Sequence, residues 1–208
     1  MKLKKNIKRL IIVLIIIIAL AAGIFVVSKL MPKKEEIKEA KVLNTIDDYE
    51  YVLKDNKSKN YQSLFKELIK ILEKEEVDEQ LYVSKLSEMF IVDFYSLADK
   101  SAKTDVGGVD IVHPDVLSNF LTNAENTFYK YVESNIYNNR EQSLPEVGTV
   151  TVETVEKTAY TYNNVTDENA YSVKVNWTYT EEEFSTYQKA ATLTFVHQDK
   201  KLYLVELK

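Results

Sequence analysis

The sequence predicts an α+β fold in which three N-terminal helices pack on a curved four-stranded antiparallel sheet, preceded by one transmembrane helix. Three observations lead to this prediction. Residues 10–28 form an apolar block without a formal charge, and residues 61–136 repeat apolar side chains at the helical period. After Pro145 the period changes to that of strands, with short polar turns between the runs. Helices followed by consecutive strands of this kind are typical of an α+β domain with an antiparallel sheet.

The apolar block Leu10–Ser28 predicts attachment to a membrane. As a helix it would span roughly 28 Å, close to the ~30 Å thickness of the hydrocarbon layer. The Lys and Arg side chains of residues 1–9 predict a cytoplasmic N-terminus and an extracytoplasmic C-terminal domain at the plasma membrane. Cleavage at Ala19-Leu20-Ala21 would release the domain instead, but the apolar run continues to Val27, beyond the usual core of a signal peptide.

Four parts follow from this pattern: a cytoplasmic basic tail (1–9), the transmembrane helix (10–28), a charged linker (29–43) and one extracytoplasmic domain (44–208). After Arg9 the chain holds 22 Lys and Arg against 32 Asp and Glu. Such an acidic domain is a poor partner for nucleic acid, whose phosphates are bound through Lys and Arg. There is no cysteine, which excludes disulfides and thiolate metal sites.

Within the domain, the apolar stripes predict where each helix lies. Tyr49, Tyr51 and Leu53 alternate with other residues and predict a short strand or extended segment. One helix is expected over 61–72, a second follows the N-cap Asp78 and runs to residue 97, and a third extends from Pro114 to residue 136. Between the second and third helices, the glycines at 107 and 108 predict a turn or bulge.

Alternation after Pro145 predicts four strands. A long or bulged strand is expected over 149–163, followed by a polar turn over 163–169. The clearest strand covers 171–179, a third lies around 191–195, and a tight turn at Asp199-Lys200 leads to the last strand over 202–207. Short turns between consecutive strands predict that all four pair antiparallel.

This order of elements resembles the nuclear transport factor 2-like (cystatin-like) superfamily over residues 45–208. The resemblance rests on element order and apolar pattern, because the superfamily has no diagnostic motif. It implies a cone-shaped apolar pocket between the helices and the concave face of the sheet, in a small enzyme or in a binding module. The single anchor ahead of the domain is similar in layout to bacterial envelope proteins and to assembly proteins of type IV secretion and conjugation machines.

Five side chains are the candidates for a ligand-binding pocket: Asp93, Tyr95, His113, Tyr131 and Tyr162. Asp93 interrupts an apolar stretch, so that burial would raise its pKa. Isomerases combine such an Asp with tyrosine hydroxyls that donate to an oxyanion. His113, with Asp110 nearby, would serve as a base or metal ligand, yet a metal site needs about three convergent ligands.

We predict no catalytic residue, metal or cofactor from this pattern. His113 is interpreted as a polar residue closing an extended segment, and His197 as a solvated histidine at a strand end beside the turn at 198–200. The tyrosines are interpreted as core and strand residues. Asp93 would equally fit the edge of its helical stripe, where it would accept a hydrogen bond from a tyrosine.

The sequence therefore favours a non-enzymatic, membrane-anchored extracytoplasmic domain that binds or assembles with a protein of the bacterial cell envelope. Two alternatives stay open: a small-ligand-binding or isomerase/dehydratase-like domain using a cone pocket, and a subunit of a secretion or conjugation apparatus. An open pocket with a buried, pKa-shifted carboxylate or His would favour the first. A pocket filled by side chains, with a large exposed apolar patch, would favour assembly.

Overall fold

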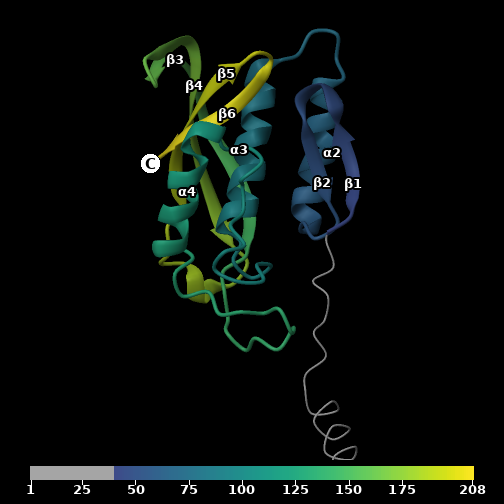
Figure 1. Ribbon diagram of the computed structural model, residues 1–208, viewed down its shortest axis with the longest axis vertical. Coiled ribbons are helices and arrows are strands. Elements are labelled where there is room, and N and C mark those ends of the chain that lie inside the picture. The colour runs from purple at the N-terminus through teal and green to yellow at the C-terminus, as the bar shows by residue number, and fades with distance from the viewer. Residues whose placement is uncertain (1–39) are drawn as a thin grey trace, which may run out of the picture. The chain divides into compact units, whose positions relative to one another are not determined.

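A two-stranded hairpin, three helices and a four-stranded sheet follow one another along residues 40–208, the part of the chain that the computed structural model describes (Figure 1). No helix within 40–208 has both the length and the apolar character needed to cross a membrane. The expected transmembrane helix, Leu10–Ser28, lies outside the described residues, as do the basic tail and most of the linker.

The hairpin at the start of the domain shows that the expected order, with the helices first, is wrong. β1 (Val42–Ile46) pairs antiparallel with β2 (Tyr51–Lys54) ahead of the first α-helix of residues 40–208, and the two strands form a sheet of their own. Most side chains of β1 are exposed, so it has no apolar face that alternation in the sequence could reveal. β2 buries Tyr51 and Leu53 and matches the expected extended segment.

The first two expected helices are confirmed as α2 (Lys59–Leu72) and α3 (Glu79–Tyr95). Each begins behind a side chain that accepts hydrogen bonds from otherwise unpaired N–H groups of the first turn. Ser58 accepts from the N–H of Tyr61, and Asp78 accepts from the N–H groups at 80 and 81. α3 is almost fully buried after its first turn, because it packs against α2 on one side and against the four-stranded sheet on another.

α4 (Pro114–Asn126) ends ten residues before the expected end of the third helix. At Thr127 the backbone leaves the helical region, with φ −121° and ψ −93°. Two residues later the buried hydroxyl of Tyr129 donates to the carbonyl of Phe94 at 2.6 Å and accepts from the N–H of Gly107 at 3.1 Å. This tie to α3 and its following turn holds the chain away from the path that a longer α4 would take.

The expected antiparallel sheet is present, with the strand order β3-β4-β5-β6. Its strands are β3 (Val147–Tyr162), β4 (Val165–Tyr179), β5 (Ala190–Gln198) and β6 (Lys201–Leu207). Figure 1 shows α3 and α4 in front of this sheet, and α3 packs on β3 and β4. The inner face of β4 and β5 supplies much of the core, including Tyr171, Val173, Leu193 and Phe195.

The β3–β4 hairpin is longer than the rest of the sheet. Asn163 and Asn164 both have positive φ (47° and 63°) and form a two-residue turn, so the polar turn begins at 163 as expected, but its expected end at 169 is wrong because β4 already starts at Val165. β5 pairs with β4 only from Tyr171 to Asn176. The distal half of the hairpin is therefore a two-stranded ribbon, which curls over at its tip in Figure 1.

Two glycines let the turn between α3 and α4 lie directly on α3. A Cβ atom on Gly107 would be 2.0 Å from the backbone oxygen of Asp93. Gly108 has φ 77°, and a Cβ atom there would be 2.6 Å from the ring of Phe90. The expected turn at these positions is confirmed, and its close approach to the helix explains why both residues lack a side chain.

We expect Gly107→Ala and Gly108→Ala each to lower the free energy of unfolding by about 2 kcal/mol or more, because overpacking typically costs ~1–3 kcal/mol. Urea unfolding of the full chain, followed through the fluorescence of Trp177, the only tryptophan, measures the change. Gly148→Ala is the matched control, since its Cβ would meet nothing closer than 3.3 Å. Equal effects of all three substitutions would contradict the close approach.

Candidate functional site

A cavity of about 510 Å³ lies between α4 and the end of β6. This volume falls within the range of roughly 300–1,000 Å³ that is typical of ligand pockets. Most of its wall is apolar, and the polar side chains in the wall belong to exposed residues or to the end of β6. The lining residues used below are Phe94, Tyr95, Val116, Asn119, Phe120, Asn123, Ala124, Thr127, Phe128, Gln188 and Val205 to Lys208.

α4 forms one wall of the cavity through two neighbouring lines of side chains. Val116, Phe120 and Ala124 follow one another at intervals of four and lie one above the other on the helix, and Phe128, just beyond the end of α4, continues the wall. The small side chain of Ala124 interrupts this row of larger ones. A second line, Asn119-Asn123-Thr127, is exposed at the rim with the same spacing.

Aromatic rings from α3 form the floor. The ring centroid of Phe94 lies 5.2 Å from that of Phe120 and 5.8 Å from that of Phe128, and Tyr95 packs on Trp177 at 4.3 Å. Burial raises the pKa of Tyr95 above its usual value, so its hydroxyl stays protonated at neutral pH. The floor thus offers apolar contact and no charge.

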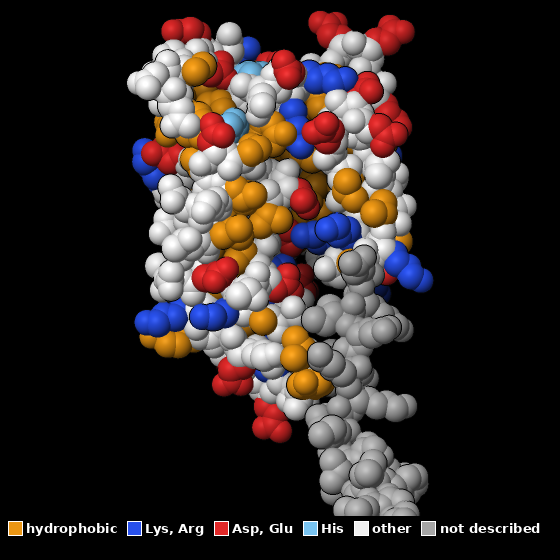
Figure 2. Space-filling model, viewed as in Figure 1, with side chains coloured by type: hydrophobic (Ala, Val, Ile, Leu, Met, Phe, Trp, Pro, Cys, Tyr) orange, Lys and Arg blue, Asp and Glu red, His pale blue; other side chains and the backbone are white. Residues whose placement is uncertain are grey.

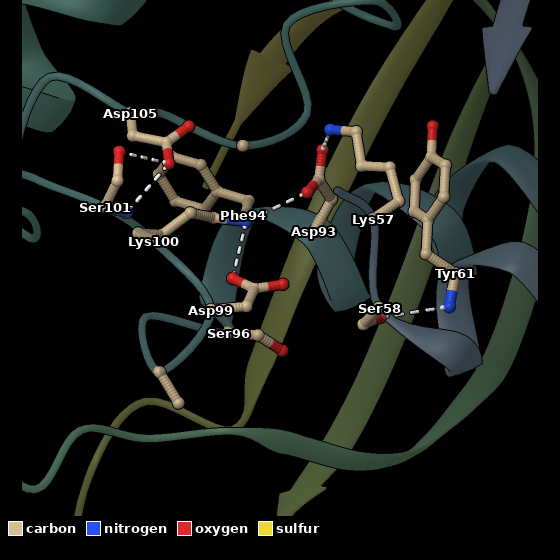
Figure 3. A network of polar contacts seen from close by, with 12 residues as sticks. Lys57, Ser58, Tyr61, Asp93, Phe94, Ser96, Asp99, Lys100, Ser101 and Asp105 are labelled. Atoms are coloured by element: carbon tan, nitrogen blue, oxygen red, sulfur yellow. Dashed lines mark hydrogen bonds and ion pairs between the residues drawn. The ribbon is translucent and has the colours of Figure 1, made fainter. Parts of the chain in front are cut away.

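Asp93 points into a separate polar cluster (Figure 3). Its carboxylate is 2.5 Å from Nζ of Lys57 and 3.0 Å from Nζ of Lys100, and it accepts the N–H of Gly108 at 2.7 Å. Lys100 also contacts Asp99 at 2.8 Å. Two carboxylates and two ammonium groups therefore balance in a site where Asp93 is only 3% exposed.

The expected rise in the pKa of Asp93 is wrong. Burial does disfavour the carboxylate, but Lys100, Lys57 and the N–H of Gly108 outweigh it, and its pKa lies below the usual value. The pKa of Lys100 is raised in turn, because Asp93 and Asp99 outweigh the cost of its burial. Held as an ion pair, Asp93 is poorly suited to take up a proton from a substrate at neutral pH.

His113 and Tyr162 come together at the tip of the β3–β4 hairpin. Their ring centroids are 5.0 Å apart, and Nδ1 of His113 accepts the N–H of Asp115, which places the histidine at the N-terminus of α4. Asn163 donates to Asp115 at 3.1 Å. The contact between His113 and Tyr162 therefore fastens the hairpin tip to the start of α4. His113 itself ends the extended segment 111–113 and caps the helix.

The five candidate side chains do not meet in one place. Of the five, Tyr95 alone lines the cavity, Asp93 belongs to the polar cluster, and His113 with Tyr162 belongs to the hairpin tip. Tyr131 is 75% exposed, with Nζ of Lys130 at 5.1 Å from its ring centre. Within the described residues no group of three His, Asp or Glu side chains is placed to hold a metal ion.

His197 is more engaged than its interpretation as a solvated residue implied. Its Nδ1 lies 2.8 Å from Asp167, whose carboxylate also accepts the backbone N–H of His197, and its Nε2 lies 3.5 Å from Glu79. Tyr171 donates to the same Glu79 at 2.7 Å. The alternating pattern of the sequence places Tyr171 on a strand and His197 at a strand end. Nothing in the sequence predicts that both contact Glu79 on α3.

Apart from Tyr95, the residues that line the cavity were missed as a site. Phe120, Ala124 and Phe128 were visible as part of a helical stripe, but such a stripe is filled by packing in most helices. Comparison with protein-family models, with curated proteins and with solved structures gives no match to this chain. The resemblance to the nuclear transport factor 2-like superfamily therefore stays a prediction.

We expect Asp93→Asn to lower the free energy of unfolding by about 3 kcal/mol at pH 7, because removing one partner leaves buried ammonium groups uncompensated. A carboxylate with a lowered folded-state pKa stabilises the fold above its ordinary pKa and stops doing so as the pH falls through the folded value. The difference between the unmodified chain and the variant should therefore shrink below about pH 4. Urea unfolding at several pH values measures it.

Asp48→Asn is the control for this experiment. Asp48 also pairs with a lysine, Lys200 at 3.1 Å, but its side chain is 83% exposed. Exposed pairs contribute about 0–1 kcal/mol. If Asp48→Asn lowered the free energy of unfolding as much as Asp93→Asn does, burial of the cluster would not be what stabilises the fold. The same conclusion would follow if the loss in Asp93→Asn did not depend on pH.

Proposed function

We propose that residues 40–208 form a non-enzymatic binding domain that is held at the outer surface of a bacterial membrane and receives an apolar part of a protein partner in the cavity. The observation that carries the proposal is the cavity itself, with aromatic and aliphatic walls, between α4 and the edge of the sheet. Apolar surface that stays open in a folded domain marks a place for a ligand or partner.

The chemistry of the cavity favours binding over catalysis. Tyr95 is protonated, and the charged side chains Glu206 and Lys208 pair with each other at 2.8 Å. The ion-paired carboxylate of Asp93 belongs to another cluster. An isomerase or dehydratase needs a base within hydrogen-bond reach of the substrate, and Glu206, the only acidic side chain among the residues that line the cavity, is paired with Lys208.

Exposed apolar side chains add to the surface that a partner would contact. On the face shown in Figure 2, hydrophobic side chains gather in patches between groups of charged ones. Attachment to a membrane would raise the concentration of the domain near a partner at the same surface, so that contacts of modest strength suffice.

Photo-crosslinking in intact cells tests the proposal. We expect a photoreactive amino acid at position 127, on the cavity rim, to give one discrete protein adduct, and the same group at the exposed position 159 to give none. Intact mass distinguishes a protein adduct from a small-molecule adduct. The second result would support the ligand-binding alternative in place of the protein-binding one.

Filling the cavity should remove the adduct. In Ala124→Phe a large side chain replaces a small one in the cavity wall, so we expect loss of at least about 90% of the adduct, roughly 1.4 kcal/mol of binding. Ala159→Phe makes the same change on an exposed position of β3 and should leave the adduct intact. An adduct that survives Ala124→Phe would refute the role of the cavity.

Membrane attachment has its own test. We expect the full chain to stay in the membrane fraction after carbonate extraction and to be released by detergent, because Leu10–Ser28 would be buried in hydrocarbon. N-terminal sequencing of the mature protein is the second measurement. A mature N-terminus at Ala22 would overturn the anchored arrangement.

A further inference from the structure

β6 is an edge strand whose outer side is covered over only part of its length. At Leu202 the backbone N–H donates to the hydroxyl of Tyr82 and the carbonyl accepts from Tyr51, both at 3.2 Å. At Leu204 the N–H donates to the carbonyl of Ile111 and the carbonyl accepts the N–H of His113, both at 2.9 Å. Within residues 40–208 no strand or bridge covers this side of β6 beyond that point.

The covering stops because the chain that provides it turns into a helix. Residues 111–113 run parallel to β6 through a single bridge between Val112 and Leu204. Pro114 begins α4, and the N–H of Asp115, which would be the next donor of such a ladder, donates instead to Nδ1 of His113. The cavity lies where the ladder would have continued, so one of its walls is the stretch Val205–Lys208 at the uncovered end of β6.

The opposite wall carries groups that match an extended peptide. Asn119 and Asn123 are four residues apart on α4, about 6 Å at a rise of ~1.5 Å per residue. Two residues of an extended chain cover about 6.6–6.8 Å. A carboxamide offers a donor and an acceptor like those of a peptide group, so the two amides suit successive peptide groups that face the same way.

From these observations we propose that the partner binds as an extended peptide segment between β6 and α4, with apolar side chains at alternate positions entering the cavity. The proposal rests on the proposed binding function of the cavity. Strand addition to an open sheet edge combines main-chain hydrogen bonds with pockets for alternate side chains. The described domain carries 29 Asp and Glu against 18 Lys and Arg, so Lys or Arg flanking the apolar positions complements its charge.

Selection from a library of random decapeptides displayed on phage, against the full chain in lipid nanodiscs, tests this inference. We expect enriched sequences with alternating apolar residues and basic flanks. Methylating one central main-chain nitrogen of a selected synthetic peptide should weaken binding at least tenfold, because a methylated nitrogen cannot donate. Amide hydrogen exchange should slow on binding within Val205–Leu207 and not within the distal β3–β4 ribbon.

Substitutions in the amide line complete the test. We expect Asn119→Leu and Asn123→Leu each to weaken peptide binding threefold to tenfold. Asn126→Leu, on the same helix but outside the cavity wall, should leave it unchanged, and circular dichroism checks that α4 persists in all three.

Three outcomes would overturn the inference. Enrichment of no peptide is the first, and binding that tolerates main-chain methylation and both asparagine substitutions is the second. Binding that survives Ala124→Phe is the third. The photo-crosslinking experiment on the cavity is independent of these results. A rim adduct without peptide binding would leave the proposed function standing and remove only the strand-like mode.

Discussion

One buried carboxylate joins segments that no backbone ladder connects. Asp93 sits in the last turn of α3, and its three partners are Lys57 just before α2, Lys100 in the loop after α3, and the backbone of Gly108. The cost of burying these charges is met only because each has an opposite charge or an N–H within hydrogen-bond distance. The cluster therefore fixes α2, α3 and the following turn as one group.

The cavity depends on that arrangement. The turn at 107–108 leads directly to residues 111–113, which pair with β6, and then to α4. At the far end, the hydroxyl of Tyr129 bonds both the carbonyl of Phe94 and the N–H of Gly107. The chain is thus tied to β6 just before α4 and to α3 and its following turn just after α4. The cavity lies along α4, between these two ties, and the small side chain of Ala124 is part of its wall.

Sequence patterns predicted the helices and strands that have one apolar and one polar face, or whose capping residues lie next to them in the sequence. α2 and α3 follow from apolar stripes and from the caps Ser58 and Asp78, and β4 follows from its alternation. β1 was not predicted because its side chains are exposed on both faces. The end of α4 was not predicted because the apolar stripe continues past Thr127 in the sequence. The path of the chain there follows from the contact of the Tyr129 hydroxyl with Phe94, a residue far away in the sequence.

The site was harder to predict for the same physical reason. The sequence shows that Asp93 interrupts an apolar stretch, but its ammonium partners are 36 and 7 residues away and determine the direction of its pKa shift. Tyr131 continues the apolar stripe of the expected helix and yet faces solvent, because that helix has already ended. A cavity depends on the distances between packed helices and strands, and the periodicity of the sequence does not report these distances.

The distal β3–β4 ribbon gives the domain a part that can open while the rest stays folded. From Ala170 toward the tip of the hairpin, β4 pairs with β3 and no longer with β5. Isolated two-stranded ribbons of this kind are marginally stable. The ribbon is fastened to the domain near its tip by the ring contact of His113 with Tyr162 and at its base by Asp167 with His197. Release of these fastenings frees the tip at a cost far below that of global unfolding. The sheet thus divides into a half on which α3 packs and a half that is held by its own hairpin ladder and by these contacts near its tip and base.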